Sequence, residues 1–427
     1  MTLTTAPRGT GGTTDPWARE RSEVRSEALF PVPAVDLLGC AVHSAAGPGL
    51  AALGAALEAP SDGRAPGATD PADLPAAPGD VPYPPLDVRP AAGFDPAAVL
   101  GRKGLSRLTR TDLLGLATCT EALEAVGGLG GPDSLTDLDG SPAAGETGVV
   151  LGSALGSASA VAEFTRDTLV QERPYLVNPS AFPSTLMNSA ASRAAIRHGL
   201  TGLNATVSGG PLASLHALRY ARNALVRGHA RQLLVGGVEE LSPHGAWAWQ
   251  RAGALAPGTA LGEGCAVFVT RLSPGPAPDL APGSAPEAGA APLARLLACD
   301  IGSADPEAGP LGVARRLADC VRGALARSGV TPEDVAVAAV GAAGRRGWAA
   351  VEERGLRQAF GPGPEPFRLR VQPVLGETHS AGGALQLAAV LARWQGPSTG
   401  AERAAVITSV GHDGSVGCAV VVRPESA

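Results

Sequence analysis

Two strand-like segments of this chain carry almost the same residues, and each lies near the end of one half of the sequence. Residues 264–269 read Gly-Cys-Ala-Val-Phe-Val, and residues 417–422 read Gly-Cys-Ala-Val-Val-Val. Another apolar strand candidate precedes each of them, at residues 232–238 and 404–410. This repeated order predicts a duplicated unit, although strands rich in Gly, Ala and Val look alike in many α/β proteins.

A second pair of similar segments lies upstream, one in each half. Residues 149–152 (Val-Val-Leu-Gly) correspond to residues 338–341 (Ala-Ala-Val-Gly). Each follows a segment with apolar residues at helical spacing, at residues 109–126 and 313–328. Continuous apolar strands that alternate with helices predict central sheets covered by helices on both faces.

Proline-rich stretches divide the chain. Its 427 residues are enough for two fused domains with a sizeable core. We expect a disordered leader over residues 1–30 and a first half over 31–270. A Pro/Ala/Gly-rich linker over 271–292 then leads to a second half over 293–424. Residues 60–92, which hold many Pro and Asp, are expected to form a surface loop.

Composition excludes several classes of protein. The formal net charge is −6 and no dense Lys/Arg cluster is present, so a nucleic-acid partner is not expected. No apolar run reaches the ~18 residues of a membrane span, and the first residues lack the apolar stretch of a signal peptide. The cysteines show no CxxC spacing, so neither a zinc site nor a disulfide framework is expected. These observations favour a soluble, cytoplasmic protein without a membrane partner.

The most informative motifs lie between residues 182 and 240. They are Phe-Pro at 182–183, Met-Asn at 187–188, Ile-Arg-His-Gly-Leu-Thr-Gly at 196–202, Asn-Ala-Thr-Val-Ser at 204–208 and Gly-Gly-Val-Glu-Glu at 236–240. With these motifs at this spacing, the chain resembles the β-ketoacyl synthase family, which has the thiolase-like fold. The resemblance implies an α/β protein of two similar βαβαβαββ halves in a layered α-β-α-β-α architecture.

Family members that catalyse condensation use a Cys nucleophile and two His residues. A helix N-terminus stabilises the thiolate, and the imidazoles assist decarboxylation and hold the enolate oxygen. In this chain the resemblance puts Pro211 at the nucleophile position and Gly341 and Glu377 at the His positions. Gln372 stands where the family has a nearby Lys. We therefore expect no catalytic residues, because proline has no nucleophilic side chain and both imidazoles are replaced.

The segment around Pro211 still has the features of a helix start. Proline is favoured in the first turn of a helix, and Ser208 or Gly209 is a candidate cap. From Leu212 to Leu225 the residues carry a clear apolar stripe. The scaffold is therefore expected to persist without its reactive group.

Several residues are candidates for lining a pocket. His379 lies two residues beyond the family His position, and a Gly-His-Asp-Gly turn at 411–414 replaces a turn that borders the family pocket. Ser208 and Ser214 lie near the nucleophile position, but neither sits in a GxSxG elbow and a serine nucleophile needs a base. The candidate pocket residues are Ser208, Gly209, Pro211, Glu377, His379, His412 and Gly414.

A ketosynthase-like chain without reactive residues looks most like a chain-length factor of a bacterial type II polyketide synthase. The resemblance implies a heterodimer with a catalytic ketosynthase, whose channel this subunit shapes, and a carrier protein that presents acyl chains on phosphopantetheine. No cofactor of its own is implied. Chain-length factors commonly carry Gln at the position of Pro211, and the loops at 257–264 and 394–404 are shorter than usual. The expected dimer interface contains Phe182, Met187, Asn188, Asn204, Thr206 and Val207.

Two other functions stay open. One is an active acyltransferase or hydrolase with unusual residues, for which the candidates are Ser208, Glu377 and His379. The other is a scaffold that docks an acidic acyl carrier protein. Its candidate surface contains Arg219, Arg222 and Arg227, although such charges also solvate ordinary helix faces.

Overall fold

A computed structural model describes residues 33–59, 81–128, 145–274, 291–396 and 402–424. The predicted leader, the central part of the predicted linker and part of the predicted surface loop lie outside these residues.

The strands of the first half form a mixed sheet in the order β5-β4-β6-β8-β1. Strand β4 pairs in parallel with β5 and β6, whereas β8 pairs antiparallel with β6 and β1. The strand bounds are Val35–Ser44 for β1, Thr147–Gly152 for β4, Asn204–Val207 for β5, Gln232–Glu239 for β6 and Gly264–Leu272 for β8.

The strands of the second half repeat this arrangement in the order β11-β10-β12-β13-β9. Strand β10 is parallel to β11 and β12, and β13 is antiparallel to β12 and β9. The identical order and directions confirm the two similar halves, with β8 equivalent to β13 and β4 to β10. The bounds are Ala294–Ser303 for β9, Val335–Val340 for β10, Phe367–Arg370 for β11, Ala404–Val410 for β12 and Ser415–Val422 for β13.

The two halves meet at β1 and β9. These strands pair antiparallel over a short register, in which Val35 lies opposite Leu296 and Leu37 opposite Ala294. Beyond Leu296, β9 pairs with β13 alone among the described strands. The part of β9 between Leu296 and Ser303 therefore has one edge that pairs with no described strand.

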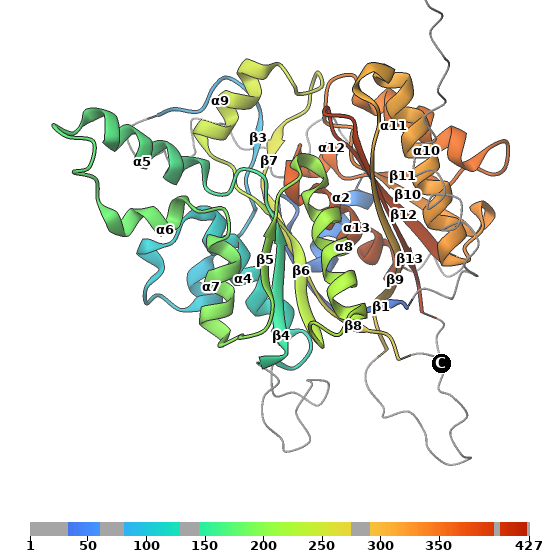
Figure 1. The fold of residues 1–427 in the computed structure, drawn as a ribbon, viewed down its shortest axis with the longest axis horizontal. Helices are drawn as coiled ribbons and strands as arrows, with labels where there is room; N and C mark the ends of the chain where they lie inside the picture. Colours follow the sequence, from blue (N-terminus) through green and yellow to red (C-terminus); the bar gives the residue numbers. More distant parts are fainter. Residues whose placement is uncertain (1–32, 60–80, 129–144, 275–290, 397–401, 425–427) are drawn as a thin grey trace, which may run out of the picture.

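Helices form layers outside and between the two halves (Figure 1). The outer layers are α4 (Arg110–Glu124) with α7 (Ser189–His198) on the first half, and α10 (Gly309–Ser328) with α11 (Trp348–Phe360) on the second. The central layer is α8 (Ala213–Val226) and α13 (Gly382–Trp394), with α2 (Gly49–Glu58) packed beside α13. This arrangement is the predicted α-β-α-β-α architecture.

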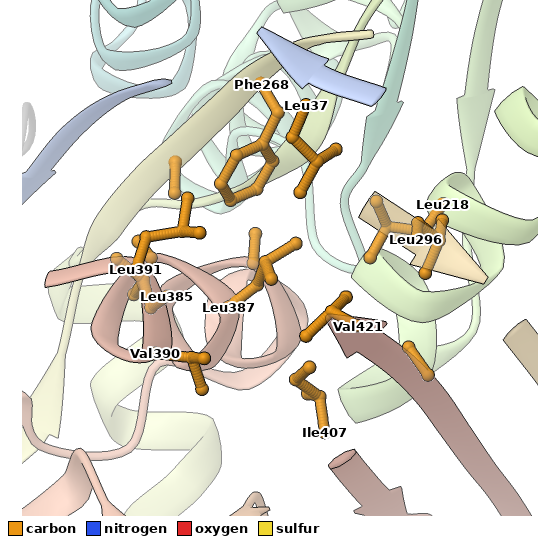
Figure 2. Close-up of a cluster of buried hydrophobic side chains, with 14 of the residues drawn as sticks. Leu37, Leu218, Phe268, Leu296, Leu385, Leu387, Val390, Leu391, Ile407 and Val421 are labelled. Carbon is orange, nitrogen blue, oxygen red and sulfur yellow. The ribbon is translucent and has the colours of Figure 1, made fainter. Parts of the chain in front are cut away.

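The central core joins both halves. Figure 2 shows Leu385, Leu387 and Leu391 of α13 beside Phe268 of β8 and side chains of other strands. In β4, Val150 faces this core while Val149 and Leu151 face the outer core. Such alternation is what strands covered on both faces require, and each buried large apolar side chain contributes about 1.5–3 kcal/mol.

Two helices project from the body of the molecule, α5 (Ala158–Val170) and α6 (Phe182–Thr185), at the left of Figure 1. We call residues 155–187 the arm. Among the described residues, no helix combines the length and apolar character needed to cross a membrane. The remaining elements are β2 (Gly47–Pro48), β3 (Val88–Arg89), α3 (Pro96–Leu100), α9 (Pro243–Ala252), β7 (Leu261–Gly262) and α12 (Gln372–Leu375).

Candidate functional site

The turn before α8 has the architecture of a helix start but no reactive group. A 3-10 turn at Gly210–Leu212 precedes the α-helix, and Pro211 is buried in it. Gly210 has a left-handed φ of 54°, which favours glycine. Gly209 is the residue that precedes this turn, whereas Ser208 is exposed and makes no cap, so the hypothesis of a serine cap was wrong.

The loop after β10 lies against this turn. The carbonyl oxygen of Gly341 accepts a hydrogen bond from Gln372 Nε2 at 3.2 Å. Ser409 connects the two positions, because its Oγ donates to the carbonyl of Pro211 at 3.0 Å and its Cα lies 3.4 Å from the site of a β-carbon on Gly341. The structure thus brings the predicted nucleophile, first His and Lys positions together.

A buried arginine fills the place between these loops. Arg345 is 1% exposed, and its Nε lies 3.8 Å from Glu377 Oε2. Its NH1 donates to the carbonyl of Val410. The carboxylate of Glu352 in α11 accepts a hydrogen bond from the backbone N–H of Ala342 at 2.7 Å. Burial raises the pKa of this carboxyl. The attraction between the two charges offsets part of the cost of burying them, and the facing atoms, Arg345 Nε and Glu377 Oε2, make no hydrogen bond.

The short loop before β8 seals the same region. Backbone hydrogen bonds join Ala256 to Gly344 at 2.9 Å and Arg346 to Ala254 at 2.9 Å. Glu377 is held on both sides, because its N–H donates to Ala260 at 2.8 Å and its carbonyl accepts from Gly262 at 2.9 Å. The loop before β8 is therefore tied to both loops that carry the predicted His positions.

The fold brings two imidazoles to the turn before α8, because the ring of His216 lies against Gly209 and that of His379 lies near Gly210. His379 comes from the loop that carries Glu377. Its Nε2 lies 3.7 Å from the site of a β-carbon on Gly210, and its Nδ1 lies 3.6 Å from Glu239 Oε2. The indole of Trp249 covers the ring edge-on at 5.2 Å between centroids. His379 has a φ of 44°, a strained value for a non-glycine residue.

No hydroxyl is placed to use this imidazole among the described residues. Ser208 is exposed, and the Oγ of buried Ser214 donates to the carbonyl of Ser380. His412 lies on the rim with an exposed ring 6.5 Å from Trp348. Its pKa is lowered by burial and by the charges of Arg345 and His379. Gly414, with a φ of 84°, closes the turn that carries His412.

A large pocket opens on the opposite side of the end of β6. It has a volume of about 1220 Å³ and lies between the arm, the start of α4 and the start of α9. Glu239 faces His379, whereas the next residue, Glu240, lines the pocket. Burial raises the pKa of Glu240 to about 7, opposed by hydrogen bonds from Thr111 and Ser159. Other lining residues are Arg107, Arg110, Ser159, Glu163, Asp167 and Arg193.

The predicted interface residues lie on the arm, just after it and on the edge strand β5. Phe182, Met187 and Asn188 are exposed on and after the arm, and β5 is an edge strand of the sheet. On β5, Asn204 is exposed while Thr206 and Val207 are half-buried. The arm and α7 carry many further exposed apolar side chains: Leu155, Val161, Leu169, Val170, Tyr175, Leu176, Leu186 and Ile196.

Comparison with known proteins agrees with this architecture. Residues 75–273 match the N-terminal domain of β-ketoacyl synthases. The ishigamide ketosynthase/chain length factor is 30% identical, with a TM-score of 0.68 over 91% of this chain and 99% of that chain.

The chain belongs to the β-ketoacyl synthase family. A β-ketoacyl synthase from Burkholderia phymatum shares the fold at 19% identity, with a TM-score of 0.72 over 92% of this chain and 100% of that one. A chain from the structure of a type II polyketide synthase acyl-carrier protein in complex with its ketosynthase also shares the fold. It is 16% identical, with a TM-score of 0.70 over 92% of this chain and 100% of that chain.

Among curated β-ketoacyl synthases, the match covers a smaller part of the chain. The 3-oxoacyl-(acyl-carrier-protein) synthase 2 of Vibrio cholerae is 29% identical over 150 residues, and that of Vibrio harveyi is 28% identical over 149. The matched stretch spans 35% of this chain and 34% of the length of each relative.

Sequence reasoning missed the arginine of the site and the pocket beneath the arm. The signal for Arg345 was present, since Gly344-Arg345-Arg346 follows a strand end where the family has small and polar residues. The pocket residues Glu163 and Arg193 had no such signal, because charged residues on helices usually face solvent.

Proposed function

We propose that this chain is a non-catalytic ketosynthase-like subunit, a chain-length factor, that pairs with a catalytic ketosynthase in a type II polyketide synthase. The observation that carries this proposal is the replacement of the reactive site. By the resemblance, Pro211 stands at the position of the family's thiol and Glu377 at that of one imidazole; in this chain Pro211 is buried in the turn and Glu377 lies beside Arg345. A thiolate is needed to accept an acyl chain, and proline at this position cannot supply one, although the imidazole of His379 lies near the turn.

The exposed face supports a partner subunit. An edge strand presents unpaired N–H and C=O groups, and natural proteins cover or pair such edges. Here β5 lies beside an arm with many exposed apolar side chains, including Leu169 at 80% exposure. Exposed apolar side chains in this number are typical of a surface that a partner covers. The 30% identity to the ishigamide ketosynthase/chain length factor supports the same proposal.

The pocket beneath the arm supports a role in limiting chain length. It opens beside the proposed interface, so an acyl chain held on the partner's thiol could extend into it. Its wall carries Glu163, whose pKa is raised by burial and by Asp167 against the opposing charge of His244. An apolar chain that reaches this carboxylate would have to remove its water, which is unfavourable. The wall would thus stop elongation without chemistry.

Co-expression tests this proposal. The chain is expressed with the catalytic ketosynthase encoded beside it, purified, and supplied with malonyl-loaded carrier protein. We expect a 1:1 heterodimer that extends acyl chains, and loss of extension when the partner's nucleophilic Cys is changed to Ala. A stable monomer that the ketosynthase leaves unaltered would contradict the proposal.

A further inference from the structure

A cluster of arginines lies beside the proposed interface, contributed by both halves of the chain. Arg219 and Arg222 come from α8, and Arg316 and Arg327 come from α10. We call these four residues the arginine cluster. The two helices lie on opposite faces of the second sheet, and their arginines converge around the unpaired edge of β9.

The contacts of β9 place these side chains together. Both Arg219 and Arg316 act electrostatically on Cys320, and Arg219 and Arg222 act on Cys299 of β9. The guanidinium of Arg316 lies against Gly302, where a β-carbon would approach its NH2 to 2.6 Å. Four guanidinium groups therefore surround the strand segment from Cys299 to Gly302.

The carboxylates near the cluster leave it positively charged. Asp300 pairs with Arg327, Asp319 near Cys320 pairs with Arg322, and Asp413 acts on His216 near the start of α8. In the described part of the chain, no carboxylate forms a salt bridge with Arg219, Arg222 or Arg316. Arg222 instead donates to the carbonyl of Pro33 at 3.0 Å, and its Nε is buried without a partner. This excess of positive charge contrasts with the formal net charge of −6 for the whole chain.

The cluster is continuous with the proposed interface. Helix α8 lies between β5 and β9, as Figure 1 shows. Its exposed residues include Arg219, Tyr220, Asn223 and Val226. Large half-exposed side chains such as Tyr220 are typical of interface cores, with charges at the rim. A partner that pairs with β5 would reach the arginine cluster across this face.

We propose that the arginine cluster binds an acidic surface of the catalytic ketosynthase and selects that subunit as the partner. This inference rests on the proposed function. Opposite charges across an interface speed association and disfavour wrong partners, whereas a second copy of this chain would bring the same basic surface. The cluster thereby favours a heterodimer over self-association.

The test compares two charge-reversed variants of the full chain. In the first, Arg219→Glu and Arg316→Glu reverse two exposed members of the cluster. In the matched control, Arg354→Glu and Arg357→Glu reverse two exposed arginines on α11. Association with the catalytic ketosynthase encoded beside this chain is measured by stopped-flow fluorescence at low and high salt, and acyl carrier protein binding is measured separately.

We expect the first variant to associate roughly tenfold or more slowly at low salt and to lose most of the salt dependence of the wild type. Arg219→Lys with Arg316→Lys should keep most of the rate, and the α11 control should match the wild type. Equal rates for both Glu variants would overturn the inference while leaving the heterodimer intact. Loss of carrier-protein binding with normal pairing would also overturn it. Failure of the wild type to pair at all would instead contradict the proposed function.

Discussion

Arg345 and Glu377 form a buried ion pair, with 3.8 Å between Arg345 Nε and Glu377 Oε2. Neither side chain is more than 4% exposed. The pair makes the replacement of the second His understandable, because a lone carboxylate at this depth would be strongly unfavourable. The burial of Glu377 therefore depends on the charge of Arg345.

Removing one partner of this pair should destabilise the protein. Arg345→Met leaves Glu377 buried without its counter-charge, which we expect to cost about 3–5 kcal/mol of unfolding free energy. Urea unfolding followed by circular dichroism measures the change. The double variant Arg345→Met with Glu377→Leu should recover most of the loss, whereas Arg346→Met, at the exposed neighbouring position, should have little effect. Equal destabilisation by the single and double variants would argue against a coupled pair.

The buried carboxyl of Glu240 should make stability depend on pH. Burial raises its pKa to about 7 from an ordinary value of 4.5, so the folded state binds a proton that the unfolded state has released between these values. Its contribution to stability is therefore greatest below about pH 4.5 and falls as pH rises to about 7, by up to about 3 kcal/mol.

Urea unfolding at several pH values from about 5 to about 8 measures this slope. Glu240→Gln should flatten it relative to the wild type, and Glu172→Gln at an exposed position should not. Parallel curves for wild type and Glu240→Gln would show that Glu240 titrates normally.

Two phenylalanines of nearly equal exposure offer a matched test of the interface. Phe182 on the arm is 50% exposed, and Phe367 on the far edge strand β11 is 51% exposed. We expect Phe182→Ser to weaken pairing with the ketosynthase by about 2 kcal/mol or more, because it removes an aromatic anchor. Phe367→Ser should leave the affinity unchanged. Analytical ultracentrifugation of the mixed subunits distinguishes the outcomes, and equal affinities for both variants would remove the arm from the interface.

The pocket wall should set the length of the product. Glu163→Leu replaces a carboxylate with an apolar side chain, so an apolar acyl chain no longer meets a group that must lose its water. We expect products longer by one or two extension units in the reconstituted heterodimer, measured by mass spectrometry. Glu172→Leu lies on the arm but does not line the pocket, and it serves as the control. An unchanged product distribution for Glu163→Leu would place the end of the channel elsewhere.

The fold could be predicted from the sequence because its strand motifs are local and occur in both halves. The Gly-Cys-Ala-Val strands occupy equivalent places as β8 and β13, since both are central strands whose two faces need small or branched apolar residues. The replacement of the catalytic positions stays a prediction, which rests on the spacing of short motifs. The role of Arg345 could not be predicted, since an arginine in a glycine-rich loop is ordinarily exposed and its burial depends on contacts with Val410 and Glu377, far along the chain.

The position of His379 also depended on tertiary structure. From sequence it stood two residues from the family position, and its approach to Gly210 follows from a left-handed backbone that no local pattern predicts. The arginine cluster is a similar case, because Arg219 and Arg316 belong to different halves and meet only around the edge of β9.

Intact-protein mass spectrometry of the reconstituted heterodimer tests the central claim most directly. Both subunits are incubated with malonyl- and acyl-loaded carrier protein and then separated and weighed. We expect an acyl adduct on the catalytic ketosynthase and an unchanged mass for this chain. A covalent acyl adduct on this chain, at any residue, would contradict the account.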